Sequence, residues 1–320
     1  KSRPILVVFN LNCLTKHRNM FKKSNWLHLR IRFSYFLLPI YIFALSISPN
    51  LSEGGLLWLF VILHLFIYPA SNAYNSFFDK DEKSIGGLKN PPPVDRGLFL
   101  LSQTFDLIGL LLAFIFFPGN YTLIAMLIAY ILASRAYSNP KIRLKKYPIT
   151  SWIIAGFFQG AWVVWLVYVG LNDFAFTNIL KPHVLIPGLL ASAILWGSYP
   201  MTQIYQHEED AKRGDITLSI RLGIKGTFMF TGIFFGLASL GYVLYFQHYY
   251  SLTYGLVFLA AMSPVIVFFT QWFVKTLKNE SNANYTNTMR LNWISATCLG
   301  GFFLYLFLHS TNILSVVGVY

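Results

Sequence analysis

Asn75-Ser76-Phe77-Phe78-Asp79-Lys80-Asp81-Glu82-Lys83 is the segment in which a long apolar stretch ends in a sudden cluster of charge. The same pattern returns in the second half of the chain at Gln206-His207-Glu208-Glu209-Asp210, and the step from Asn75 to Gln206 equals that from Asp79 to Asp210. In both segments an amide residue precedes an aspartate by four positions, so on a helix the two side chains lie one turn apart on the same face. If the fold brings the two faces together, their oxygen atoms form a site suited to a hard divalent cation.

The composition is that of an integral membrane protein. Hydrophobic residues make up 55% of the 320 residues and charged residues only 12%, against roughly 25% charged residues in a soluble domain. A bilayer-spanning helix needs about 20 mainly apolar residues. The stretches of this kind are residues 33–49, 55–75, 98–117, 121–137, 150–171, 184–204, 226–246, 252–275 and 291–317. The sequence therefore predicts an all-α integral membrane protein with nine transmembrane helices around an intramembrane cavity.

The positive charge is distributed as at a membrane surface. The net charge of +13 alone would suit a nucleic-acid partner, but with the N-terminus in the cytoplasm 24 of the 25 Lys and Arg residues fall on the cytoplasmic side. Only Lys181 lies on the other side, so the positive-inside rule predicts this orientation. Anionic lipid head groups account for most of this charge. We expect no nucleic-acid partner, a bacterial inner (plasma) membrane location, a cytoplasmic N-terminus and a C-terminus on the opposite side.

The loops divide the chain into an arm and a repeated membrane domain. Residues 1–32 are expected to form a basic arm at the cytoplasmic membrane surface, and residues 33–320 the nine-helix domain. Eight of the twelve Asp and Glu residues fall in two loops, after the second and the sixth span, and both loops lie on the cytoplasmic side. The chain therefore reads as two four-helix units in parallel orientation plus a ninth helix. A basic loop, residues 137–146, lies between the two acidic loops.

Two acidic loops and one basic loop at one membrane face suit a diphosphate held through Mg²⁺. Mg²⁺ prefers oxygen ligands and is usually bound by one or two carboxylates together with substrate phosphates. Cations nearby would stabilise the charge that grows on a departing diphosphate. Aromatic residues make up 18% of the chain, so the spans offer apolar walls behind the site. A ligand with a diphosphate head and a hydrocarbon tail fits this division.

Three motifs carry a resemblance to a known family. They are Asn75-x-x-x-Asp79 after the second span, Tyr137-Ser-x-Pro-x-x-Arg143-x-Lys145 after the fourth, and Asp210-x-x-x-Gly214-x-x-Thr217-Leu218-x-x-Arg221-x-Gly223 after the sixth. With these three motifs in this order, the chain resembles the UbiA-type intramembrane prenyltransferase superfamily over nearly its whole length. The resemblance implies Mg²⁺-dependent transfer of a prenyl group from an isoprenyl diphosphate to a hydrophobic, usually aromatic, acceptor in quinone or pigment biosynthesis.

The chain departs from the family pattern at two positions. Lys83 stands where the first motif usually has its last Asp, and Gln206 stands where the second acidic motif usually begins with Asp. Asp81 or Glu82, and Glu208 or Glu209, could substitute from neighbouring positions, and Lys83 could contact the diphosphate directly. Equally, one metal could be bound instead of two, or the chain could be a non-catalytic paralogue acting as a lipid-binding protein or a transporter. The expected metal ligands are Asn75, Asp79, Asp81, Glu82, Gln206, Glu209 and Asp210, with Asp79 and Asp210 also catalytic. The expected diphosphate contacts are Lys83, Tyr137, Arg143, Lys145 and Arg221.

Two ionisable residues lie deep in predicted spans, where burial is costly without a partner. They are His64, which precedes Asn75 in the second span, and Asp106, which follows Arg96 in the third. Each lies about three helical turns from the charged end of its span, so both reach a similar depth in consecutive antiparallel helices. We expect them to face one another or the same cavity, either as a structural pair or with Asp106 as a catalytic residue that orients or deprotonates the acceptor.

Overall fold

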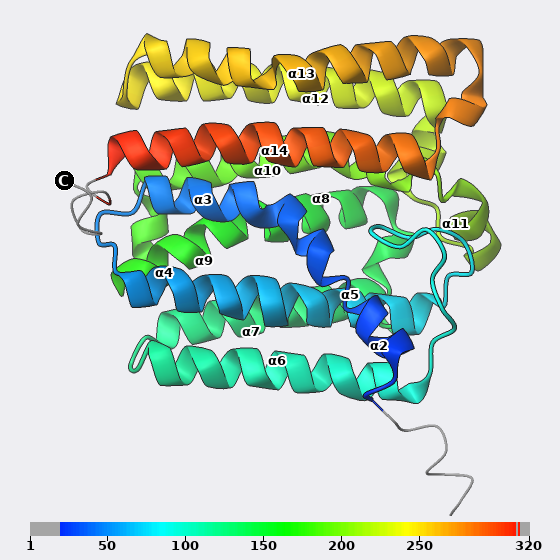
Figure 1. Ribbon diagram of the computed structural model, residues 1–320, viewed down its shortest axis with the longest axis horizontal. Helices are drawn as coiled ribbons and strands as arrows, with labels where there is room; N and C mark the ends of the chain where they lie inside the picture. The colour runs from blue at the N-terminus through cyan, green and yellow to red at the C-terminus, as the bar shows by residue number, and fades with distance from the viewer. Residues whose placement is uncertain (1–19, 312, 314–320) are drawn as a thin grey trace, which may run out of the picture.

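The computed structural model describes residues 20–311 and 313, and within them nine helical segments are long and apolar enough to cross a membrane. The segments lie side by side as a bundle (Figure 1). They are Lys23–Ser46, Glu53–Asp79, Arg96–Phe116, Tyr121–Ser138, Pro148–Asn172, Pro182–Gln203, Leu218–Tyr249, Leu252–Lys278 and Tyr285–Ser310. The prediction of an all-helical membrane protein with nine spans is confirmed. Positions 1–19 of the expected basic arm lie outside the described residues.

Prolines interrupt the first two spans. The first consists of α2 (Lys23–His28), the 3₁₀-helix η1 (Ile31–Leu37) and α3 (Leu38–Ser46), and Pro39 stands at the start of α3. The second consists of α4 (Glu53–Phe60), the π-helix η2 (Val61–Ile67) and α5 (Tyr68–Asp79). Pro69, in the first turn of α5, cannot donate a backbone hydrogen bond to the preceding turn. The backbone widens into π geometry directly before it, as π-bulges within α-helices do.

A glycine breaks the fifth span and lets it approach the sixth. This span consists of α8 (Pro148–Gln159) and α9 (Ala161–Asn172), separated by Gly160, whose φ and ψ of −102° and −94° are not helical. A Cβ atom at Gly160 would lie 2.6 Å from the backbone of Ser192. Ser192 belongs to α10 (Pro182–Gln203) and accepts a hydrogen bond from the free Ala161 N–H at 2.9 Å. The break therefore joins the two spans by backbone contact.

The remaining helices complete the two units and the ninth span. These are α6 (Arg96–Phe116) and α7 (Tyr121–Ser138) in the first unit, α12 (Leu218–Tyr249) and α13 (Leu252–Lys278) in the second, and α14 (Tyr285–Ser310). The short helices are η3 (Leu144–Lys146), η4 (Phe176–Leu180), α11 (His207–Arg213) and η5 (Glu280–Asn282). α14 packs against α3 and α13, so the ninth helix joins the first unit to the second.

The two acidic segments meet at one end of the bundle. α5 ends at Asp79 with Lys80 in the left-handed conformation, and α11 follows α10 after a short turn. Figure 1 shows the end of α5, the connection from α5 to α6, and α11 together at this end. Two hydrogen bonds join the connection between α5 and α6 to the region of α11. Lys83 N–H donates to Glu209 Oε1 at 2.9 Å, and Gln206 Nε2 donates to the Ser84 carbonyl at 3.4 Å.

Candidate active site

A polar cavity of about 230 Å³ opens where α5, α7, α10 and α11 come together. Asp79, at the end of α5, and Asp210, in α11, both line it. The repeated sequence pattern predicted this meeting of two segments from different halves of the chain. The full set of charged residues that line the cavity is Arg30, Asp79, Asp81, Lys145, Asp210, Arg213 and Asp215.

The basic loop after α7 pairs with two of these aspartates. Lys145 forms an ion pair with Asp79 Oδ1 and lies 3.5 Å from Asp215. Arg143 binds Asp215 through two parallel hydrogen bonds of 2.8 Å, the strongest geometry for such a pair, and lies 3.8 Å from Asp79. The loop thus places two cations beside the carboxylate at the end of α5.

Arg213 pairs with the aspartates of the two acidic segments. It donates to Asp210 at 2.6 Å within α11 and to Asp81 from the first acidic segment. It also lies 3.5 Å from Asp215. One guanidinium group therefore bridges two segments that are distant in the sequence.

The aspartates of the cavity differ in their tendency to ionise. Burial raises the pKa of Asp210 to about 6, although the charges of Arg213 and Lys145 oppose this shift. Burial also disfavours the ionised form of Asp215, but the hydrogen bonds from Arg143 and the charge of Lys145 outweigh it and hold the pKa of Asp215 below its usual value. Asp215 is therefore a fixed negative charge near neutral pH, whereas Asp210 takes up a proton in mildly acidic solution.

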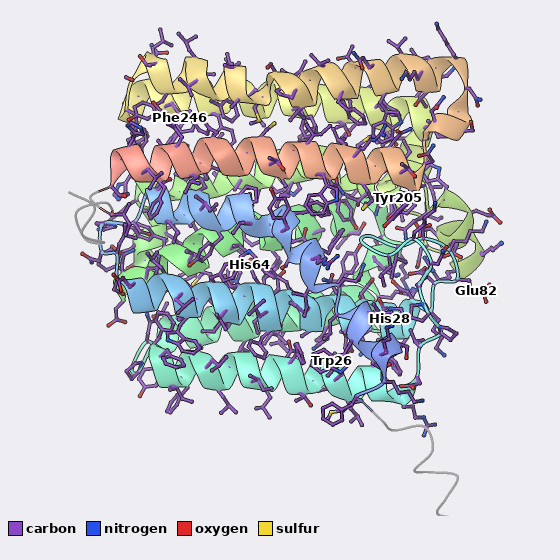
Figure 2. The ribbon with its side chains drawn as sticks, viewed as in Figure 1. Trp26, His28, His64, Glu82, Tyr205 and Phe246 are labelled. Atoms are coloured by element: carbon purple, nitrogen blue, oxygen red, sulfur yellow. The ribbon has the colours of Figure 1, made fainter. Side chains whose placement is uncertain are left out.

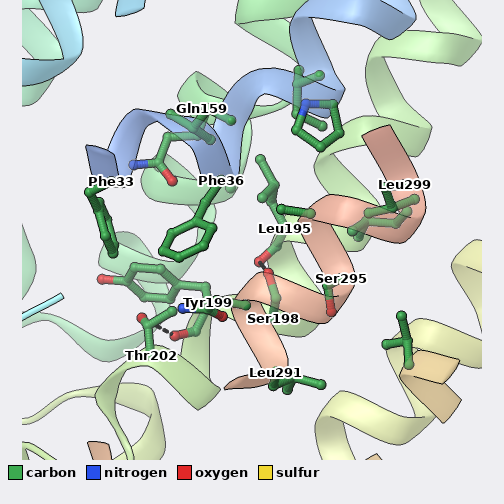
Figure 3. A pocket seen from close by; sticks show the side chains of 18 of the residues that line it. Phe33, Phe36, Gln159, Leu195, Ser198, Tyr199, Thr202, Leu291, Ser295 and Leu299 are labelled. Carbon is green, nitrogen blue, oxygen red and sulfur yellow. Dashed lines mark hydrogen bonds between the residues drawn. The ribbon is translucent and has the colours of Figure 1, made fainter. Parts of the chain in front are cut away.

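An apolar cavity of about 260 Å³ adjoins the polar one and shares part of its lining. Its walls include Phe36, Leu195 and Leu299, which Figure 3 shows around a common space. None of its described lining residues is Asp, Glu, Lys, Arg or His. The residues that line both cavities are Phe33, Ser71, Asn72, Tyr130, Gln159, Tyr199 and Thr202. The site therefore has a charged chamber at one end and an uncharged chamber inside the membrane.

Several other predicted residues also line the polar cavity. Asn75 does so and donates from its amide nitrogen to Ser138 Oγ at 3.0 Å, and Gln206 also lines the cavity. Tyr137 lines it as well, and its hydroxyl forms a hydrogen bond with that of Tyr199.

Five of the predicted metal and diphosphate residues lie outside the set that lines this cavity, and one of them, Arg143, contacts Asp79 and Asp215 from the basic loop. Lys83 is exposed and pairs with Glu208 rather than with a cavity aspartate. Glu82 and Arg221 are also exposed, and Figure 2 shows Glu82 at the outer edge of this end of the bundle. Glu209 accepts the Lys83 backbone N–H. Glu82, Lys83 and Arg221 are directed to the surface, whereas Glu209 Oε2 lies 4.0 Å from Arg213 of the charged chamber.

The predicted pairing of His64 with Asp106 is wrong. Asp106 forms an ion pair with Arg135 of α7, and both are nearly buried. His64 packs against the rings of Phe60 and Tyr68, and neither of its ring nitrogens has a hydrogen-bond partner in the described structure. Asp106 lines neither cavity, so the structure does not place it as a catalytic residue near an acceptor.

The sequence patterns missed several polar residues of the site. Asp215 and Arg213 lie just beyond the second acidic motif, and their charge is the only feature of the sequence that would have indicated a place in the site. Gln203, in the last turn of α10, has a buried Oε1 atom without a hydrogen-bond partner among the described residues. Arg30 precedes the first predicted span and looked like surface charge.

The fold and the two-chambered site define a class of helical membrane proteins with a charged pocket at one face. A sequence model of the UbiA prenyltransferase family matches residues 36–296. The chain belongs to this family, as the three motifs predicted. A search of curated proteins gave no match.

Solved structures share the fold at low sequence identity. A UbiA homologue from Archaeoglobus fulgidus bound to GPP and Mg²⁺ is 18% identical with a TM-score of 0.59, and the match covers 89% of this chain and 99% of that one. The same homologue bound to DMAPP and Mg²⁺ is 17% identical with the same TM-score and coverage. A digeranylgeranylglyceryl phosphate synthase is 19% identical with a TM-score of 0.55, covering 90% and 97%.

Proposed function

We propose that the protein transfers a prenyl group from an isoprenyl diphosphate to a hydrophobic acceptor within the membrane, with Mg²⁺ as the cofactor. The observation that carries this proposal is that Asp79 and Asp210 line one charged chamber with Lys145 and Arg213, and that this chamber adjoins an uncharged one. A diphosphate head and a hydrocarbon tail match the two chambers. Relatives with the same fold have been solved with GPP, DMAPP and Mg²⁺.

The donor atoms of the charged chamber fit Mg²⁺ bound together with phosphate. Among the described residues no three acidic, His or Cys side chains stand close enough to hold an ion unaided. However, the chamber offers the carboxylate oxygens of its aspartates, and Gln203 Oε1 is a buried oxygen without a hydrogen-bond partner among the described residues. Mg²⁺ commonly takes one or two carboxylates and completes its shell with substrate phosphates and water. Asp79 and Asp210 would hold the ion, with Asn75, Asp81, Gln203 and Gln206 nearest to complete the site.

The cations of the chamber would then take the diphosphate. When bound, Mg²⁺ would neutralise charge on the diphosphate oxygens. Lys145 and Arg213 line the chamber, so their charge would be available to the phosphate oxygens. The bond between C1 of the prenyl group and the diphosphate oxygen breaks with its electron pair on the oxygen, and these cations stabilise the charge that develops. The acceptor forms the new bond to C1 and gives up a proton.

The product of this reaction tests the proposal directly. Cells that produce the wild-type protein should contain a prenylated lipid or quinone, detected by mass spectrometry of the lipid fraction, that is strongly reduced when Asp79→Asn or Asp210→Asn is produced instead. Because several kcal/mol of charge stabilisation is lost with a metal ligand, we expect roughly 100-fold less product. Asp173→Asn is the matched control, because Asp173 is exposed in the loop after α9. Equal product from wild type and both site variants, all folded to the same extent, would contradict the proposal.

A further inference from the structure

One wall of the apolar chamber carries polar side chains without partners among the described residues. The wall is a face of α14, formed by Leu291, Asn292, Ser295, Ala296 and Leu299, which all line the chamber. Their spacing of three and four residues is that of one helix face. The two polar members, Asn292 and Ser295, lie one turn apart. Polar side chains that face an apolar space within a membrane protein are costly, so their presence points to a partner.

The hydroxyl group of Ser295 lacks the bond that two other hydroxyl groups of the chamber make. Ser and Thr side chains within helices commonly donate to a carbonyl of the preceding turn. Ser198 donates to the Leu195 carbonyl at 3.2 Å and Thr202 to the Tyr199 carbonyl at 2.7 Å, and Figure 3 marks both bonds. Ser295 Oγ is shielded from solvent and has no hydrogen-bond partner among the described residues. Its hydroxyl group can therefore both donate and accept a further bond.

The amide group of Asn292 faces the same space. The side chain is partly buried, lines the chamber and forms no hydrogen bond with any residue that the structure describes. An amide offers two N–H donors and one carbonyl acceptor, and its placement against apolar walls costs free energy unless a hydrogen bond compensates. By contrast, Thr297 is exposed, lines neither chamber and pairs with the Tyr35 hydroxyl at 3.0 Å.

The position of this pair along α14 separates it from the charged chamber. Tyr285, the first residue of α14, packs against the ring of Tyr205, which lines the charged chamber, so α14 begins at the charged end. Asn292 and Ser295 follow two to three turns later, which is about 10–15 Å along the helix. The prenyl chain of the donor consists of carbon and hydrogen and offers no atom that could bond to an amide or a hydroxyl group. The pair therefore suits the second substrate, the acceptor.

We propose that Asn292 and Ser295 bind an uncharged oxygen, a carbonyl or hydroxyl group, of the acceptor. This inference rests on the proposed function and extends it to two residues of the ninth helix. The Asn292 amide and the Ser295 hydroxyl donate to that oxygen and hold the acceptor in one orientation. Aromatic walls that include Phe36 and Phe258 suit a ring that carries such an oxygen. The oxygen is uncharged, because none of the described lining residues of this chamber is Asp, Glu, Lys, Arg or His.

A matched pair of probes tests the proposal on the full chain in nanodiscs. 1,4-Naphthoquinone carries carbonyl oxygens, and naphthalene has the same ring system without them. Equilibrium dialysis against loaded and empty nanodiscs gives the affinity of the protein for each. Asn292→Leu, which keeps a similar shape without the amide, and Ser295→Ala should each weaken quinone binding by roughly 3- to 10-fold, and neither should weaken naphthalene binding. Thr297→Val is the control, because it removes a hydroxyl group of α14 outside the two chambers.

Thermal unfolding in detergent separates binding from a structural role. Because the two groups have no partner among the described residues, neither variant should have a lower Tm. A lower Tm in both variants would show that the groups support the fold, and it would overturn the proposal.

The binding outcomes distinguish this inference from the proposed function. Unchanged quinone affinity in both variants, an equal loss of naphthalene affinity, or an equal loss of quinone affinity in Thr297→Val would overturn the inference. Wild-type protein that does not bind geranyl S-thiolodiphosphate with Mg²⁺, which resembles the donor, would contradict the proposed function. Wild-type protein that binds this diphosphate but binds the quinone no better than naphthalene would contradict only the role of Asn292 and Ser295.

Discussion

The ionisation of Asp210 should make metal binding depend on pH. Burial raises the pKa of this carboxyl group to about 6, so it is mostly neutral below that pH and mostly charged above it. A neutral carboxyl group is a poor ligand for Mg²⁺. We therefore expect the Mg²⁺ concentration needed for diphosphate binding to rise as the pH falls from 7.5 to 5, by about tenfold for each pH unit well below the pKa.

Binding of geranyl S-thiolodiphosphate, an unreactive analogue of an isoprenyl diphosphate, to the protein in nanodiscs at a series of Mg²⁺ concentrations and pH values measures this effect. In Asp210→Asn the group that titrates is removed, so the dependence should be much weaker while overall affinity is lower. A wild-type Mg²⁺ requirement that stays constant between pH 5 and pH 7.5 would show that Asp210 is not a ligand.

The ion pair between Asp106 and Arg135 should act on stability rather than on chemistry. The two side chains are only 10% and 13% exposed, and Asp106→Asn would leave the Arg135 charge without its partner inside the bundle. Breaking a buried pair of this kind costs about 3–5 kcal/mol, which thermal unfolding in detergent would detect as a lower Tm. The double variant Asp106→Asn with Arg135→Gln should recover part of the loss. Lost turnover in a stable Asp106→Asn protein would instead restore a catalytic role.

Residue spacing predicted the depth of Asp106 but not its partner. A count of residues from a helix end gives the level in the membrane, because the rise per residue is constant. The direction in which a side chain points also depends on the rotation of its helix, and the π-helix at Val61–Ile67 changes that rotation around His64. Asp79 and Asp210 do line one cavity, because Asp79 ends α5 and Asp210 lies in α11, the short helix that follows α10 at the same end of the bundle.

At the scale of elements, the break in the fifth span should not tolerate a side chain. In Gly160→Ala the new Cβ atom would stand 2.6 Å from the Ser192 backbone, which cannot move aside as a flexible side chain can. Such overpacking costs about 1–3 kcal/mol, so we expect a lower Tm in detergent. Gly236→Ala in α12 is the control, because no atom lies within 4 Å of its added Cβ and its backbone is helical. An equal Tm for both variants would mean that the approach of the two spans is not rigid.

The sequence predicted the existence of the spans better than their internal form. Apolar runs of about 20 residues predict a membrane helix whatever its neighbours, so all nine predicted spans overlap the observed ones. The apolar pattern says nothing about local geometry, and it therefore missed the π-helix and the break at Gly160. It also began the ninth span at residue 291, whereas α14 begins at Tyr285, because polar residues form its first turns.

At the scale of the whole molecule, the repeat explains why one end of the bundle holds the site. Two units of four helices in parallel orientation return their second and sixth spans to the same side, so the matched spacing of the two amide–aspartate pairs predicted a shared pocket. The joining of the charged and uncharged chambers was not predictable, because it depends on residues such as Tyr199 and Gln159 that line both. These side chains carry no charge pattern by which a sequence would reveal them.

The same topology predicts which end of the bundle faces the cytoplasm. All the charged residues of the chamber lie at one end of the bundle, and 24 of the 25 Lys and Arg residues were assigned to that side, so we expect this end to face the cytoplasm. In a variant with Cys13 and Cys298 replaced by Ser, a single cysteine at Thr177, beside Lys181, should react with a membrane-impermeant maleimide in intact cells. A cysteine at Lys146 should react only after the cells are opened. Both positions are exposed, so access to solvent does not limit either reaction. The reverse labelling pattern would place the charged chamber on the outer face, where cytoplasmic isoprenyl diphosphates do not reach it.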